Sequence, residues 1–210
     1  MMEAFFVLQF REEKHVQSRP DREPTTHRAN VKRDTTLMSH DSNPFPASDQ
    51  DRYAIWEMLV REDVDGFVNE DWSLFGRSFK HSGFCGLDAK GSLNPADWQV
   101  RFPTVEAYRD AWLEDASRSA ATAYAEDRRE ALFRATNMLD IRVQGRTATA
   151  RKTFDDAIAL EGGGSQKLNW QSVFFCTKDD DGWKITGFVG FLPFSPEPEG
   201  ERVMKDRDVP

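Results

Sequence analysis

The sequence has few of the residues that mark several common classes of protein. Only two cysteines occur in 210 residues, Cys85 and Cys176, which are too few for a disulfide framework and lack the spacing of a zinc site. No run approaches the ~20 apolar residues of a membrane-spanning helix. Met1–Phe10 is apolar but short, contains Glu3 and lacks the basic leader of a secretory signal. We therefore expect a cytoplasmic protein in a reducing environment, without a membrane partner.

Basic residues are also in deficit, since 28 Lys and Arg face 36 Asp and Glu for a formal net charge of -8. Nucleic-acid binding requires clustered Lys and Arg to neutralise phosphates, and no basic stripe is present, so we expect no nucleic-acid partner. Histidine is scarce as well. His81 is the only one of four within the expected folded domain, and one histidine without a nearby second ligand does not predict a metal site. The sequence also gives no indication of a cofactor.

Composition divides the chain into an arm, a domain and a tail. Residues 1–47 contain no Gly, Trp or Tyr, and carry seven basic and seven acidic residues. Such a segment buries too little apolar surface to offset its ordering entropy, so we expect a disordered arm. Two interpretations of residues 1–37 stay open: a genuine arm, or a mis-assigned extension upstream of a start at Met38. We expect the folded domain at 48–193 and an extended, proline-rich tail at 194–210.

The first half of the domain has the pattern of helices. Ser48 to Asp51 resembles a capping box, and the apolar residues that follow recur at three- and four-residue spacing, which predicts one buried helix face. These residues are Ile55, Trp56, Leu59, Val60, Val64 and Phe67. A shorter helix follows Asn69-Glu70-Asp71, and Thr104 caps a third helix whose inner face carries Tyr108, Ala111, Trp112 and Asp115. The segment Ala120–Arg129 is compatible with either helix or loop.

The second half alternates with period two, which predicts antiparallel strands. Ala148, Ala150, Lys152 and Phe154 fall on one side of a strand, and Thr147, Thr149, Arg151, Thr153 and Asp155 on the other. We expect Arg151 to pair with acids on the outer face of the sheet, where such ion pairs contribute little. An inward Asp-Arg-Asp cluster is the alternative. The order of elements predicts an α+β fold, a strongly curved antiparallel sheet wrapped around the N-terminal helices like a cone.

Three motifs in this order resemble the nuclear transport factor 2-like superfamily, which includes ketosteroid isomerases and SnoaL-like polyketide cyclases. They are Asn69-Glu70-Asp71-Trp72 with Phe75 and Phe79, the run Gly145–Arg151, and Asp181-Gly182-Trp183-Lys184-Ile185. The resemblance covers about Ser48–Pro193 and implies a cystatin-like α+β fold with a pocket. It does not settle the function, because the fold hosts isomerases, dehydratases, cyclases, hydrolases and binding modules.

Asp88 and His81 are the catalytic candidates. By the resemblance, Asp88 falls where ketosteroid isomerases place the aspartate that moves a proton next to a carbonyl. The competing interpretation is a turn, for which an aspartate between glycines is ordinary chemistry. His81 could serve as its acid or base partner, or be an ordinary solvated histidine. The sequence departs from the isomerase pattern because Leu168–Thr177 contains no acid, so steroid isomerisation by that mechanism is not expected.

Aromatic residues predict a pocket for a small hydrophobic ligand, and we expect it to be lined by Tyr53, Trp56, Trp98, Trp112 and Trp170. Core and interface packing is the competing use of these rings. We expect a homodimer through the outer sheet face, on Val173, Phe175 and Phe188. The sequence is best interpreted as a cofactor-independent lyase or isomerase; the alternative is a non-catalytic binding module. An accessory subunit of a ring-hydroxylating oxygenase is a third option, from the resemblance alone.

Overall fold

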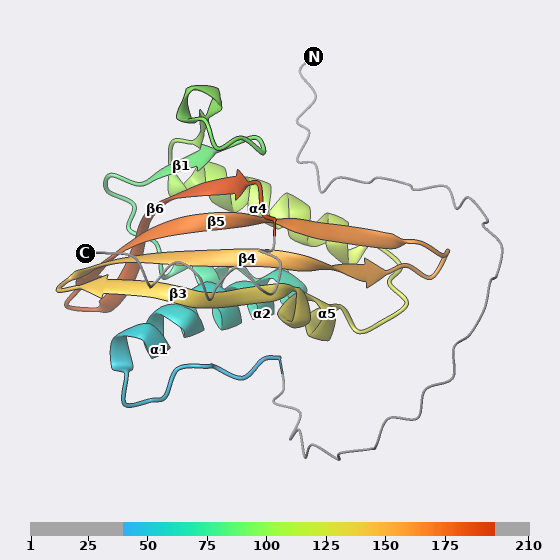
Figure 1. The fold of residues 1–210 in the computed structure, drawn as a ribbon, viewed down its shortest axis with the longest axis horizontal. Helices are drawn as coiled ribbons and strands as arrows, with labels where there is room; N and C mark the ends of the chain where they lie inside the picture. Colours follow the sequence, from blue (N-terminus) through green and yellow to red (C-terminus); the bar gives the residue numbers. More distant parts are fainter. Residues whose placement is uncertain (1–39, 196–210) are drawn as a thin grey trace, which may run out of the picture.

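The computed structural model describes residues 40–195, so the expected 1–37 extension and nearly all of the 194–210 tail lie outside the described residues. Helices occupy much of the first half of this range, and four strands the second (Figure 1). The helical segments are α1 (Gln50–Trp56), the π-helical turn η1 (Glu57–Glu62), α2 (Asp63–Asn69), α3 (Trp72–Gly76), the 3-10 turn η2 (Pro95–Asp97), α4 (Val105–Ala120) and α5 (Arg128–Ala135).

The six strands form one sheet in the order β2-β1-β6-β5-β4-β3. All neighbours are antiparallel except β1 and β6, which run parallel. Figure 1 shows α2, α4 and α5 gathered on one face of this sheet. The predicted α+β class, with helices enclosed by a curved, mostly antiparallel sheet, is confirmed. The bounds are β1 (Cys85–Asp88), β2 (Gln99–Phe102), β3 (Thr136–Gln144), β4 (Thr147–Ala159), β5 (Ser165–Asp179) and β6 (Gly182–Leu192).

Side-chain caps set where the helices begin. Thr104 accepts a hydrogen bond from the backbone N–H of Ala107, as expected for the cap of α4. At α1 the cap is Asp49, which accepts from the N–H of Arg52, and not the predicted Ser48. The ambiguous segment after Ala120 is a loop that leads to α5, whose cap is Asp127.

The alternation in β4 has the predicted facing. Ala148, Ala150 and Lys152 are buried against the helices, while Arg151 is exposed on the outer face. Arg151 Nη2 lies 3.1 Å from Asp140 Oδ2. The outer-face interpretation is therefore confirmed, and the inward Asp-Arg-Asp cluster is not formed.

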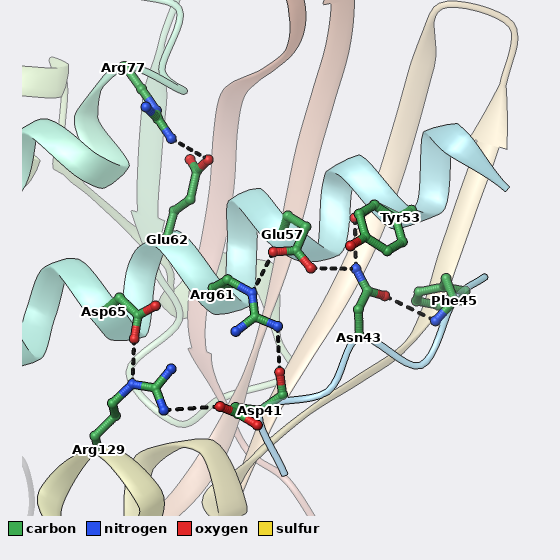
Figure 2. A network of polar contacts seen from close by, with 10 residues as sticks. All are labelled: Asp41, Asn43, Phe45, Tyr53, Glu57, Arg61, Glu62, Asp65, Arg77 and Arg129. Atoms are coloured by element: carbon green, nitrogen blue, oxygen red, sulfur yellow. Dashed lines mark hydrogen bonds and ion pairs between the residues drawn. The ribbon is translucent and has the colours of Figure 1, made fainter. Parts of the chain in front are cut away.

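The segment before α1 packs on the helices, although we expected the arm to extend to residue 47. Figure 2 shows Arg129 of α5 joining two acids: its Nε donates to Asp65 Oδ1 (2.7 Å) and its Nη1 to Asp41 Oδ2 (3.1 Å). Asn43 donates to Glu57 Oε1 (2.9 Å). Residues 41–45 thereby link η1 to α5, and Arg129 links α5 to α2.

A second arginine ties α5 to the sheet. Arg134 donates to Glu126 Oε2 and to Asp156 Oδ2 on β4, both at 2.6 Å. These hydrogen bonds to the guanidinium lower the pKa of both carboxyls. The hydrogen bond from Arg134 to Asp156 thus fixes α5 against β4 of the sheet.

Within residues 40–195, no helix has both the length and the apolar character needed to cross a membrane.

Candidate functional site

A pocket of about 150 Å³ lies between the helices and the inner face of β4, β5 and β6. Its wall is mainly aromatic and aliphatic, with a few polar groups, which is the usual character of a small-molecule site. The lining residues with polar side-chain atoms are Asp63, Tyr108, Trp112, Asp115, Ser119, Tyr124, Lys152, Gln166, Trp170 and Ser172.

Lys152 is the most deeply buried charged group in this lining, with 1% of its surface exposed. Its Nζ donates to Asp63 Oδ2 (2.6 Å) and to the carbonyl oxygen of Leu59 (2.7 Å). Leu59 lies in η1, where the π-helical turn interrupts the regular α-helical hydrogen-bond pattern. The wide turn and the start of α2 therefore offer two acceptors to one buried ammonium.

Asp63 is held from a third direction by α4. The indole N–H of Trp112 donates to Asp63 Oδ1 (2.9 Å), so each carboxylate oxygen has a partner. A carboxylate that accepts from an ammonium and an indole is fixed in place and keeps the charge of Lys152 compensated. Asp63 therefore positions Lys152.

Lys152 retains one donor for a ligand. An ammonium has three N–H groups. Within residues 40–195 the ammonium of Lys152 hydrogen-bonds to Leu59 and Asp63, and it also lies 5.1 Å from the centroid of the Phe154 ring, a weaker contact than a hydrogen bond to an oxygen. Because Lys152 lines the pocket, the third N–H can meet an acceptor there, such as a carbonyl oxygen.

Tyr108 contributes a neutral donor. Burial raises the pKa of its hydroxyl well above the ordinary value, and the negative charge of Asp63 raises it further. The phenol therefore stays protonated at any physiological pH. Its ring packs edge-on against Phe188 with centroids 4.9 Å apart, which fixes its place in the wall.

Asp115 is the second acid of the pocket and the more deeply buried of the two, with 3% of its surface exposed. Its Oδ1 accepts a hydrogen bond from Arg118. Its Oδ2 is buried and has no hydrogen-bond partner among residues 40–195.

Farther along α4, hydroxyl groups form a short chain. Ser119 Oγ lies 3.2 Å from the Tyr124 hydroxyl, which donates to Gln166 Oε1 (2.6 Å). These groups satisfy one another, so we assign them to the shape of the pocket and not to ligand binding.

Aromatic rings line the sheet side. Phe154 and Trp170 stack with centroids 4.5 Å apart, and Trp170 lies 6.1 Å from Phe191. Phe191 has a φ of 56°, a left-handed conformation that is uncommon for a bulky side chain and frequent near functional sites. A flat ring is the ligand shape that suits this wall.

Of the five predicted pocket residues, Trp112 and Trp170 line the cavity and three do not. Tyr53 lies on α1, partly exposed, and Trp56 is buried in the main core. Trp98 packs beside Ala89, Val189 and Leu192 in a separate cluster and donates its indole N–H to the carbonyl of Ser92 (2.9 Å).

Asp88 and His81 are not among the residues that line the cavity. The two residues have different interaction partners. Asp88 Oδ1 accepts from the N–H of Lys90 (2.8 Å), and its Oδ2 pairs with Arg101 (3.1 Å). The first contact is the turn geometry that was the alternative for this residue. His81 is exposed, with Nδ1 2.8 Å from Glu106 Oε1. Their catalytic roles stay predictions.

No group of three or more His, Cys, Asp or Glu side chains within residues 40–195 is arranged to hold a metal ion.

Asp63, Asp115 and Lys152 are not among the site residues predicted from the sequence, although the sequence contains a signal for two of them. Lys152 interrupts the apolar side of β4 between Ala150 and Phe154, so an inward lysine was implied by the period-two pattern itself. Asp115 shares the inner face of α4 with Trp112 at a spacing of three residues. For Asp63 we find no such signal, because its partners come from distant segments.

Comparison with family models and with curated proteins found no match to this sequence. Among solved structures, the chain is similar to a domain with a cystatin-like fold from Nostoc punctiforme, at 14% identity and a TM-score of 0.48, covering 70% of this chain and 79% of that one. An NTF2-like protein from Novosphingobium aromaticivorans gives 14% identity and 0.47, covering 72% and 87%. An NTF2-like superfamily protein from Salmonella enterica gives 12% identity and 0.45, covering 73% and 98%. The first two of these structures are described as having a cystatin-like fold, and the second and third as NTF2-like.

Proposed function

We propose that the pocket binds a small, mostly apolar cyclic or aromatic carbonyl compound and activates it for proton transfer, as a cofactor-independent isomerase or lyase. The observation that carries the proposal is the third N–H of Lys152, which makes no hydrogen bond within residues 40–195, in a cavity whose wall is otherwise largely apolar. A donor on a buried cation is placed to meet the oxygen of a ligand that has few other polar atoms.

The chemistry follows from where negative charge develops. When a solvent base (water or hydroxide) takes a proton from the carbon next to a carbonyl, negative charge develops on the carbonyl oxygen, and a preorganised cationic donor stabilises that charge. The protonated phenol of Tyr108 is a second donor in the same lining. The carboxylate of Asp63 holds the ammonium of Lys152 in place and compensates its buried positive charge.

The size of the pocket limits the ligand. A cavity of about 150 Å³ accepts a benzene-sized molecule, so a single ring with a short substituent is the expected scale. For about nine non-hydrogen atoms, ordinary ligand efficiency predicts a Kd of roughly 0.1–1 mM.

Acetophenone tests the proposal. We expect isothermal titration calorimetry to show binding to the wild type and at least about tenfold weaker binding to Lys152→Met, because one charge-assisted hydrogen bond is lost. Arg151→Met is the matched control, since Arg151 is the preceding residue of β4 but lies on the outer face. Equal binding to Lys152→Met and the control would contradict the proposal.

Catalysis is separated from binding by hydrogen exchange. If the pocket activates the carbonyl, the methyl protons of acetophenone should exchange with D2O faster with the wild type than with Lys152→Met, as followed by NMR. Binding without faster exchange would instead support the alternative, a non-catalytic small-molecule binding module.

A further inference from the structure

We propose that Asp115 is a recognition site for a hydroxyl group, and that the natural substrate is a hydroxylated ring ketone with its carbonyl on Lys152 and its hydroxyl on Asp115. This inference rests on the proposed function for the carbonyl end and adds the chemistry of the opposite end. It arises from the one carboxylate oxygen in the pocket lining that the described residues leave unpaired.

The unpaired oxygen is costly unless a ligand uses it. Burying a carboxylate oxygen without a hydrogen bond destabilises a protein, and Asp115 Oδ2 is buried with no partner within residues 40–195. Asp115 is one of the residues that line the cavity, so a donor on a bound ligand can supply the missing hydrogen bond once the side chain turns Oδ2 toward it. Retaining a costly group in a cavity is typical of binding sites.

The ligand donor is a neutral hydroxyl. The charge of Asp115 is already matched by Arg118, which binds the other oxygen, so the site does not require a cation. Lys152 lies in the same lining, and its ammonium repels a second positive charge. An O–H group satisfies the oxygen without adding charge.

The two groups line one cavity beside a flat wall. Lys152 on β4 and Asp115 on α4 both belong to its lining, and Trp112, three residues before Asp115 on α4, donates to the aspartate that holds Lys152. The stacked pair Phe154 and Trp170 lies in the same lining and offers a flat surface to a ring.

Calorimetry with acetophenone, 3-hydroxyacetophenone and 4-hydroxyacetophenone tests the inference below neutral pH, where the phenols are protonated. At least one hydroxy isomer should bind the wild type about tenfold or more tightly than acetophenone, because the added hydrogen bond is to a charged group. 4-Fluoroacetophenone, similar in size but without an O–H, should show no such gain.

Asp115→Asn should abolish the hydroxyl advantage, so that the hydroxy isomer and acetophenone bind the variant with similar Kd values. Its amide oxygen is expected to remain on Arg118, so its NH2 group faces the pocket and the acceptor is lost. Glu114→Gln is the matched control: Glu114 pairs with the same arginine, but its side chain is 66% exposed, so the advantage should persist.

The outcomes separate the two proposals. If acetophenone binds but hydroxylation gives no gain in the wild type, or the gain survives Asp115→Asn, the Asp115 inference is overturned and the proposed function stands. If acetophenone does not bind the wild type, both fall. Should Asp115→Asn fail to fold, the comparison of hydroxy and fluoro ligands in the wild type still decides the question.

Discussion

The pair of Lys152 and Asp63 should couple strongly in a double-mutant cycle. Lys152 is 1% exposed and the Asp63 side chain 17% exposed. Lys152→Met removes the ammonium and leaves Asp63 Oδ2 and the carbonyl of Leu59 without their donor. Breaking a buried ion pair from one side costs about 3–5 kcal/mol. Because Asp63 can recruit some water, we expect a loss of about 2–4 kcal/mol.

Replacing Asp63, the partner of Lys152, should lower the free energy of unfolding by a similar amount. Asp63→Asn keeps an acceptor for the indole N–H of Trp112 but leaves the ammonium of Lys152 without a counter-charge, so we expect a loss of similar size. The double variant buries neither charge. It should therefore be less destabilised than the sum of the single variants by about 1–3 kcal/mol.

Urea unfolding followed by circular dichroism measures these free energies, and unchanged m-values would show that the unfolded state is comparable. Arg151→Met is the control, because its ion pair with Asp140 is on the surface, with 51% of the arginine side chain exposed. It should cost less than about 1 kcal/mol. Additive single effects, or a Lys152→Met loss no larger than that of the control, would refute the reasoning.

Three further predictions concern the fold, acid stability and assembly. Gly187→Ala should lower the free energy of unfolding by about 1–3 kcal/mol in urea, because its Cβ would lie 2.5 Å from a backbone oxygen of β1, whereas Gly162→Ala, with open space around it, should leave stability within about 0.5 kcal/mol. Arg134 lowers the folded-state pKa of Glu126 and Asp156, so the wild type should lose stability as pH falls below the ordinary values of 4.5 and 3.8 for these carboxyls. Arg134→Met should weaken this dependence of the free energy of unfolding on pH. An unchanged dependence would contradict the assignment. The sequence predicts a homodimer through the outer sheet face, where Phe175 is 44% exposed. Light scattering should give twice the chain mass of 24.1 kDa for the wild type and the mass of one chain for Phe175→Lys. A monomeric wild type would exclude the predicted dimer.

Much of the fold could be predicted because it depends on local patterns. The period-two alternation of β4 placed Ala148 and Ala150 inside and Arg151 outside, as the structure has them. The alternation predicts which face of the sheet a side chain lies on, but it does not predict which residues that side chain contacts. Phe188, which we considered for the dimer interface, faces inward and lines the pocket.

The site was harder to predict because its polar contacts join distant segments. Lys152 meets Leu59 and Asp63 across 93 and 89 residues, and a helical pattern does not reveal which acid of α2 will face a given strand residue. The unpaired oxygen of Asp115 likewise depends on what the surrounding elements leave uncovered. Tryptophan content alone could not separate the pocket residue Trp112 from the core residue Trp56, because both are buried.

The infrared spectrum of bound acetophenone is the most direct test of a carbonyl site at Lys152. A hydrogen bond from a buried ammonium polarises the carbonyl, so its stretching band should move to lower frequency on binding to the wild type than in water. An isotope label on the carbonyl carbon identifies the band. A bound ligand whose carbonyl band lies at or above its frequency in water would show that no strong donor meets the oxygen, and the account of Lys152 would be wrong.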